Sequence, residues 1–290
     1  MFRMSQKLLI ICCFLGLPVF LHANSWKLVN SIDSGPEGIH LKSPMGIYYH
    51  YKSKKFYIVD SGNNRLISYS INGKPLKEFD AAGKLKLPVG MIKDSEGNLW
   101  IIERSTNSLV FVNLREKKII SKQITYHGNL LFPGKIDKWS EKIVILDKYS
   151  GKVFLLDKNF NAEKAVFPKR GDFKGFFDIK VKDKKLYGME TLTGRIFYGD
   201  YPFNEFQMIT PDKKLTEPVS FDIDKNKNIY ILDRFLERIF IFNNNGKLLN
   251  TQLKAGNRAG NLYYPWYLKI VGNNIFIINE GNGRVDIFQY

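Results

Sequence analysis

The sequence predicts an all-β fold, a six-bladed β-propeller of four-stranded antiparallel blades in which an N-terminal strand completes the last blade. Short apolar segments alternate with Gly- and Asn-containing turns, as between residues 56 and 79, where Asn72-Gly73 marks a hairpin. An acidic or amide residue also closes a strand at regular places: Asp60, Glu103, Asp147, Glu190, Asp233 and Asn279. The intervals are 43, 44, 43, 43 and 46 residues, a period typical of repeated small sheets.

Residues 1–23 are predicted to be a secretory signal peptide. Met1–Lys7 carries two basic residues, Leu8–Leu21 is apolar and uncharged, and Ala23 provides a small residue before a cut. The apolar run is shorter than the roughly 20 residues that a membrane-spanning helix needs, although a retained anchor stays open as the alternative. We therefore expect an exported protein, periplasmic or extracellular.

Residues 24–290 are expected to form a single propeller domain and a monomer. This part of the chain has no cysteine, because Cys12 and Cys13 lie in the N-terminal segment, and thiol catalysis and thiolate metal sites are thereby excluded. The segment Trp26–Ile32 reads as a strand without a neighbour. We predict that it pairs with Arg284–Tyr290, because the last blade would otherwise expose an apolar edge.

Each blade is predicted to begin with a lead-in loop and a proline, which suits the first residue of a strand. These prolines are Pro44, Pro88, Pro133, Pro218 and Pro265. The fourth blade has Lys174 in this place, within Phe173-Lys174-Gly175.

The blade pattern resembles the NHL repeat family. The resemblance rests on Pro44-Met45-Gly46-Ile47, on the segment FYIVDSGNNR at residues 56–65 and on Asn72-Gly73-Lys74, and it covers residues 25–290. It implies a six-bladed propeller. Its members include protein- and RNA-binding modules, sensor ectodomains and a few lyases, so it implies no single function.

The formal net charge is +16, and removal of Arg3 and Lys7 lowers it to +14. Such a surface favours anionic partners. Lysines are expected on both faces of the ring, so charge by itself indicates no single docking patch. Binding of anionic polymers in the cell envelope is one alternative function, whereas the expected export argues against a nucleic-acid partner.

A basic residue follows the closing acid by five positions in several blades, as in Asp60/Arg65 and Glu190/Arg195. We interpret these pairs as structural clamps across the turn between second and third strands. Exposed pairs of this kind contribute only about 0–1 kcal/mol each.

A metal-assisted lyase or lactonase is the enzymatic alternative. Lyases that resemble this family hold a metal with histidines, but residues 24–290 contain only His40, His50 and His127, which are not expected to converge. The gluconolactonase group holds a divalent metal with carboxylates, and its Glu-Gly-Pro-x-Trp lead-in is not found here. Serine-hydrolase and P-loop motifs are also missing from the sequence, and no catalytic residue is assigned.

Four aromatic residues, Tyr263, Tyr264, Trp266 and Tyr267, lie at the start of the last blade, where we expect one mouth of the channel. Aromatic side chains there can stack on a sugar or accept an anchor from a protein. The alternative is that they pack between blades.

The last candidate site lies inside the channel. The positions four residues after each lead-in are Tyr48, Ile92, Asp137, Asp178, Asp222 and Lys269. We predict that the three aspartates line the channel at similar height, with Lys269 beside Asp222. Buried carboxylates need a partner, which would be lysine and water in a salt-bridged plug or a divalent cation such as Ca²⁺ or Mg²⁺.

The sequence thus favours an exported binding or scaffold module for a protein or carbohydrate ligand at the channel mouth. An enzyme and a polymer binder remain as alternatives.

Overall fold

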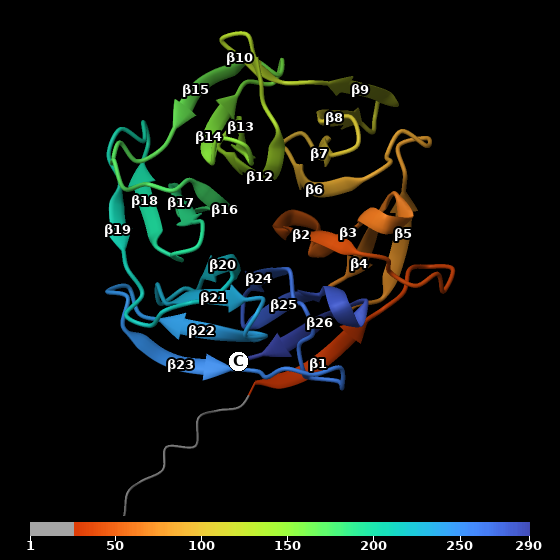
Figure 1. Ribbon diagram of the computed structural model, residues 1–290. Helices are drawn as coiled ribbons and strands as arrows, with labels where there is room; N and C mark the ends of the chain where they lie inside the picture. The colour runs from red at the N-terminus through yellow and green to blue at the C-terminus, as the bar shows by residue number, and fades with distance from the viewer. Residues whose placement is uncertain (1–25) are drawn as a thin grey trace, which may run out of the picture.

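The computed structural model describes residues 26–290, which form a closed ring of six blades around a central axis (Figure 1). The first three blades contain β2 (Pro44–His50), β3 (Lys55–Asp60), β4 (Arg65–Ser70) and β5 (Pro75–Phe79); β6 (Pro88–Lys93), β7 (Leu99–Glu103), β8 (Ser108–Asn113) and β9 (Lys118–Lys122); and β12 (Pro133–Trp139), β13 (Lys142–Asp147), β14 (Lys152–Leu156) and β15 (Ala162–Val166). The predicted signal peptide lies outside the described residues.

The second half of the ring repeats this order. Its blades contain β16 (Phe176–Lys182), β17 (Lys185–Glu190), β18 (Ile196–Asp200) and β19 (Gln207–Ile209); β20 (Pro218–Ile223), β21 (Ile229–Asp233), β22 (Arg238–Phe242) and β23 (Leu248–Gln252); and β24 (Tyr267–Val271), β25 (Asn274–Asn279), β26 (Arg284–Gln289) and β1 (Lys27–Ile32). The predicted fold class is therefore confirmed, including closure of the last blade by the N-terminal strand.

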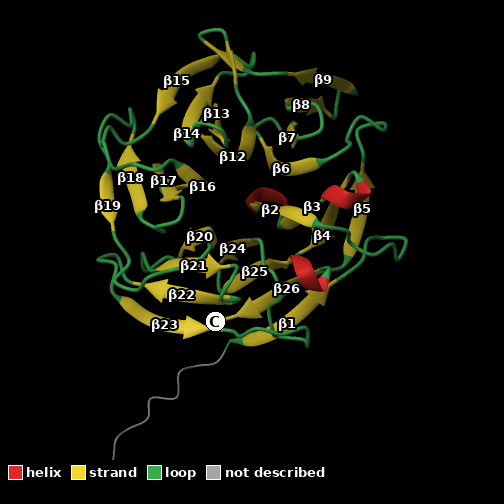
Figure 2. Ribbon diagram, in the orientation of Figure 1, coloured by secondary structure: helices red, strands yellow, loops and turns green. Residues whose placement is uncertain are grey.

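Few other elements interrupt the ring (Figure 2). A short hairpin, β10 (Thr125–Tyr126) and β11 (Asn129–Leu130), joins the second and third blades. Three single-turn 3₁₀ helices occur in turns: η1 (Tyr51–Ser53), η2 (Ser61–Asn63) and η3 (Glu280–Asn282). No helix among residues 26–290 is long and apolar enough to cross a membrane.

The core consists of six apolar clusters, and each one fills the space between two adjacent blades. Phe56 of the first blade meets Phe276 of the sixth, with ring centroids 5.0 Å apart. The second strand of each blade is almost wholly buried, as in β7, whereas the outer strand β5 is largely exposed. Burial on both faces explains why the second strands are continuous apolar runs.

The closing residues have one structural role in all six blades. Each is buried and accepts a hydrogen bond from a backbone N–H of its blade's lead-in loop, donated by Lys42, Leu87, Phe132, Lys174, Thr216 and Tyr263. The predicted ionic clamp forms in only two blades: Arg65 Nε lies 2.8 Å from Asp60, and Arg195 Nε lies 2.7 Å from Glu190. The feature that all six turns share is thus the bond to the lead-in loop, which restrains the start of every first strand.

The first strands approach one another closely around the axis. A Cβ atom on Gly46 would lie 3.1 Å from the Val89 carbonyl oxygen of the next blade, which accounts for glycine at this position. Farther along the strands larger side chains occur, and they define the channel.

Candidate functional site

The channel contains a cavity of about 450 Å³ that is lined by residues from all six first strands and reaches the turns after β2 and β6. Five lysines line it: Lys52, Lys135, Lys138, Lys182 and Lys269. Three aspartates, Asp94, Asp137 and Asp222, also contribute. Tyr48, Tyr51 and Tyr267 supply aromatic surface.

Equivalent positions in the blades follow from strand pairing. Asp137 and Asp222 lie four residues after the prolines that pair with the closing acids, and Lys269 occupies the same level. In the fourth blade Phe176 pairs with closing Glu190, so Lys180 takes this level and Asp178 aligns with Lys135. The register assumed for this blade is therefore wrong by two residues, and the three predicted aspartates do not lie at one level.

Each of the three aspartates links its own blade to the next. Asp137 accepts hydrogen bonds from the backbone N–H of Lys138 at 2.8 Å and of Val181 at 2.7 Å. Asp222 does the same with Ile223 and Ile270, both at 2.8 Å. Asp178 accepts from Ile179, from Phe221 and from the Ser220 hydroxyl. The carboxylates therefore join neighbouring first strands, and Asp137 and Asp222 also line the cavity.

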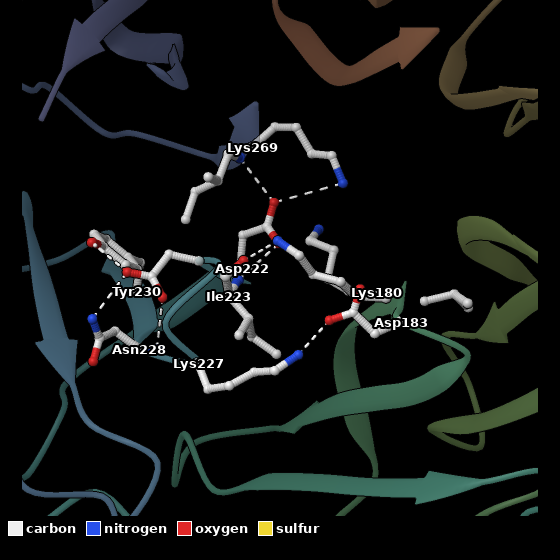
Figure 3. A network of polar contacts seen from close by, with 12 residues as sticks. Lys180, Asp183, Asp222, Ile223, Lys227, Asn228, Tyr230 and Lys269 are labelled. Carbon is white, nitrogen blue, oxygen red and sulfur yellow. Dashed lines mark hydrogen bonds and ion pairs between the residues drawn. The ribbon is translucent and has the colours of Figure 1, made fainter. Parts of the chain in front are cut away.

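Lysines supply the counter-charge for two of these carboxylates. Lys180 Nζ lies 3.0 Å from Asp178 and 3.0 Å from the Tyr267 hydroxyl, and Lys135 Nζ lies 3.8 Å from Asp178. Lys182 and Lys269 approach Asp222 at 3.7 and 3.6 Å. Figure 3 shows Lys269 reaching the Asp222 carboxylate from the neighbouring blade, which confirms the expected proximity of these two side chains.

Burial and charge shift the protonation equilibria in different directions. Burial lowers the pKa of Lys135 to about 8, because Asp178 offsets only part of its desolvation. Burial also opposes the charged form of Lys180, but nearby Asp178 outweighs it and raises the pKa of Lys180. The pKa of Asp137 is raised by burial, against the opposing effect of Lys269. The channel wall thus combines a firmly charged amine, Lys180, with a cavity-lining amine, Lys135, whose pKa of about 8 lies near neutrality.

Positive charge is in excess at the cavity wall. Asp94 accepts hydrogen bonds from the side chains of Asn98 and Trp100. Asp222 lies between two lysines, Lys182 and Lys269. Burial raises the pKa of Asp137 and so disfavours its negatively charged form. The lining is therefore suited to receive an anion.

The four aromatic residues that were predicted to form the channel mouth lie in three different environments in the structure. Tyr263 and Tyr264 are 43% and 49% exposed, with ring centroids 4.7 Å apart. Trp266 packs against two inter-blade clusters, and of the four aromatics only Tyr267 lines the cavity. Arg234 covers both Tyr264 and Trp266, at 5.5 and 5.3 Å from their ring centroids. The four side chains consequently do not form one continuous platform.

Neither of the metal-ligand sets suggested by the sequence fits this site. Within residues 26–290 no three His, Cys, Asp or Glu side chains are grouped so that they could hold a metal ion. His50 contacts Ser53 at the end of β2, while His40 precedes the first blade and His127 lies in the β10–β11 hairpin. The three carboxylates that were candidates for a Ca²⁺ or Mg²⁺ site instead accept hydrogen bonds from backbone N–H groups, and Asp178 and Asp222 also pair with lysines.

Three lysines of the channel wall escaped the sequence analysis: Lys135 and Lys182, which line the cavity, and Lys180, which pairs with buried Asp178. Their signal was the alternation of Lys and Asp at residues 135–138 and 178–182. Polar residues at every second position of a first strand indicate a strand whose channel face is wet or ion-paired.

Comparisons with known proteins give the fold. No protein-family model matches the sequence, and no curated protein matches it, so the NHL assignment stays a resemblance. Virginiamycin B lyase from Staphylococcus aureus superposes with a TM-score of 0.66 at 13% identity, over 92% of this chain and 100% of the lyase. A gluconolactonase from Xanthomonas campestris superposes with a TM-score of 0.66 at 12% identity, over 89% of this chain and 87% of that chain. At such identities the likeness establishes a shared six-bladed fold and nothing finer.

Proposed function

We propose that this propeller is a binding module that takes a small anionic ligand in its central cavity. The observation that carries the proposal is the charge of the lining, where five lysines face three aspartates whose oxygens already have partners. Unbalanced positive charge in a confined site costs free energy unless an anion accompanies it. A bound anion would remove that cost.

The size and the aromatic residues of the cavity narrow the ligand class. About 450 Å³ lies within the range of small-molecule sites, which is roughly 300–1,000 Å³. Tyr48, Tyr51 and Tyr267 offer aromatic faces and hydroxyl groups beside the lysines. These features suit a sugar acid or a sugar phosphate, so the carbohydrate ligand expected from the sequence is kept while its place moves from the mouth into the channel. The expected export puts this ligand outside the cytoplasm.

The other candidate functions have less support. The lyase and gluconolactonase of similar fold raise the enzymatic alternative, but it lacks a matching set of metal ligands among residues 26–290. Binding of a polymer by charge on the outer surface would not account for the five lysines that line the cavity.

Calorimetric titration with three related probes tests the proposal: glucuronate, glucose 6-phosphate and neutral glucose. We expect the two anions to bind and glucose to bind at least about tenfold more weakly, which corresponds to about 1.4 kcal/mol. Lys269→Met should weaken anion binding, and Lys84→Met, which changes an exposed lysine outside the cavity lining, should not. Equal affinity for glucose and glucuronate, or no effect of Lys269→Met, would contradict an anion site in the channel.

A further inference from the structure

Three adjacent blades carry a large, exposed apolar side chain at the same position of the turn between second and third strands. Tyr149, Leu192 and Phe235 are 87%, 74% and 68% exposed, and each lies two residues after the closing acid of its blade. We call these three residues the apolar row. The corresponding positions in the other blades are small: Gly62, Ser105 and Gly281. At this turn position, blades three to five therefore carry an exposed apolar side chain, and the other three blades carry a small residue.

The fold holds the apolar row on one face. In each of these blades the turn donates a backbone hydrogen bond to the lead-in loop: Lys148 N to Phe132 O, Thr191 N to Gly175 O and Arg234 N to Glu217 O, all at 2.9 Å. Since the same bond recurs in blades three, four and five, their turns share one height. Tyr263 and Tyr264 continue the exposed apolar surface into the lead-in loop of the sixth blade.

Basic residues surround the apolar row on the same face. The turns and lead-in loops of blades three to five contain six exposed cations, Lys148, Lys169, Arg170, Lys174, Lys213 and Lys214. The exposed acids of these segments are Asp172, Asp212 and Glu217, and Asp172 is already paired with Arg170 and Arg195. The face therefore has protruding apolar groups within a positively charged surround.

We propose that this face docks the protein on an anionic lipid surface. Tyr, Leu and Phe side chains enter the boundary between headgroups and acyl chains, and lysines remain at the level of the lipid phosphates. Each member of the row stands on its own turn and is at least 68% exposed, so the three do not pack into one contiguous patch. The core of a protein interface is contiguous and close-packed, whereas a fluid bilayer accommodates separate protrusions, and the geometry therefore favours lipid over a protein partner.

Sedimentation with lipid vesicles tests this docking. The probes are vesicles of equal parts phosphatidylglycerol and phosphatidylcholine, and vesicles of phosphatidylcholine alone. Residues 24–290 are used beside the full chain, because they contain every strand of the ring and leave out the apolar N-terminal run. We expect binding to the anionic vesicles that weakens as salt rises. The triple variant Tyr149→Ser/Leu192→Ser/Phe235→Ser should lose at least about tenfold in vesicle affinity, since apolar burial scales with area.

A matched control changes exposed leucines elsewhere. Leu114, 48% exposed in the turn between β8 and β9, lies on the opposite face, and Leu249, 53% exposed, lies in the outer strand β23. Leu114→Ser/Leu249→Ser should bind vesicles like wild type. In addition, the variant Tyr149→Trp should gain fluorescence quenching by brominated acyl chains relative to wild type, which reports insertion directly.

Four results would overturn the proposal. The first is that residues 24–290 do not bind anionic vesicles at low salt, and the second is that the triple variant and the leucine control lose equal vesicle affinity. The third is that Tyr149→Trp shows no added fluorescence quenching, and the last is that soluble glycerol 3-phosphate displaces the protein from vesicles. The last would assign binding to a headgroup-sized pocket. If the apolar row binds a protein partner instead of lipid, residues 24–290 should not bind the vesicles, which is the first of these results.

Discussion

Lys180 and Asp178 form an ion pair that is almost completely enclosed at the channel wall. Lys180 Nζ lies 3.0 Å from Asp178 Oδ2, and their side chains are 3% and 0% exposed. Both groups have further partners, Tyr267 for the lysine and Ser220 for the aspartate. Removal of one member of such a pair leaves a buried charge without its partner, which is far more costly than removal of both.

Asp178→Asn should therefore destabilise the protein by about 3–5 kcal/mol in urea denaturation. The double variant Asp178→Asn/Lys180→Met should recover part of this loss, because it removes the orphaned ammonium group. A single-variant loss below about 1 kcal/mol, or a double variant no more stable than the single one, would contradict this account of the pair.

The same pair predicts a pH dependence of stability. Burial opposes ionisation of Asp178, but Lys180 and Lys135 outweigh it, so the pKa of Asp178 lies below the usual value of 3.8. The stability that this depressed pKa provides is fully present above pH 3.8 and is lost as pH falls through the folded-state pKa. Wild type should lose stability on acidification in this window, and Asp178→Asn/Lys180→Met should lose less, as measured by urea denaturation at several pH values.

Anion binding in the cavity should weaken as pH rises through about 8. Burial lowers the pKa of Lys135 to about 8, and the amine gives up its positive charge above that value. Titration of glucuronate at pH 6.5 to 9 should give a falling affinity in wild type and a flatter profile in Lys135→Met. Parallel profiles in the two proteins would show that another group controls the dependence.

Closure by β1 should contribute to stability. β1 pairs with β26, Ile32 is buried, and Trp26 lies against Tyr230 and Phe288 at centroid distances of 6.0 and 6.3 Å. Residues 33–290 should therefore unfold at lower temperature and less cooperatively than residues 24–290. Within β1, Ile32→Ala should cost about 2–5 kcal/mol, whereas Val29→Ala, at a position 45% exposed, should cost below about 0.5 kcal/mol. Identical melting of the two chain lengths would rule out a stabilising role for closure.

The two aromatic residues Tyr264 and Trp266, which precede β24, should differ in how much their substitution by alanine lowers stability. Trp266 is half-buried and packs against two inter-blade clusters, so Trp266→Ala should cost about 3 kcal/mol, the lower end of the range for a buried tryptophan. Tyr264 is 49% exposed, and Tyr264→Ala should leave thermal stability almost unchanged. If both variants are equally stable, Trp266 does not have the packing role assigned to it, and its use as a ligand-binding residue at the mouth regains support.

Local patterns in the sequence were enough to determine the propeller. Apolar alternation, the turn at Asn72-Gly73 and the recurrence of a closing acid predicted the number of blades and the strands, and the unpaired segment Trp26–Ile32 predicted closure. Apart from closure, these features depend on interactions among neighbouring residues of one blade. Closure joins the two ends of the chain, and it was predicted because the first strand and the last blade each lacked a partner. The closeness of Lys269 to Asp222 was also predictable, because both lie four residues after a proline at or just before the start of a first strand.

The candidate site was decided by the tertiary structure. Without a proline, the fourth blade admitted two registers that differ by two residues, and a shift by two keeps every side chain on the same face of a strand. The alternation of Asp178, Lys180 and Lys182 therefore could not distinguish them, and only pairing of Phe176 with Glu190 placed Lys180 beside the channel carboxylates. Likewise, the members of the apolar row lie 43 positions apart in the sequence, and the five cavity lysines come from four different blades. Only the closed ring brings the first set to one face and the second set into one cavity.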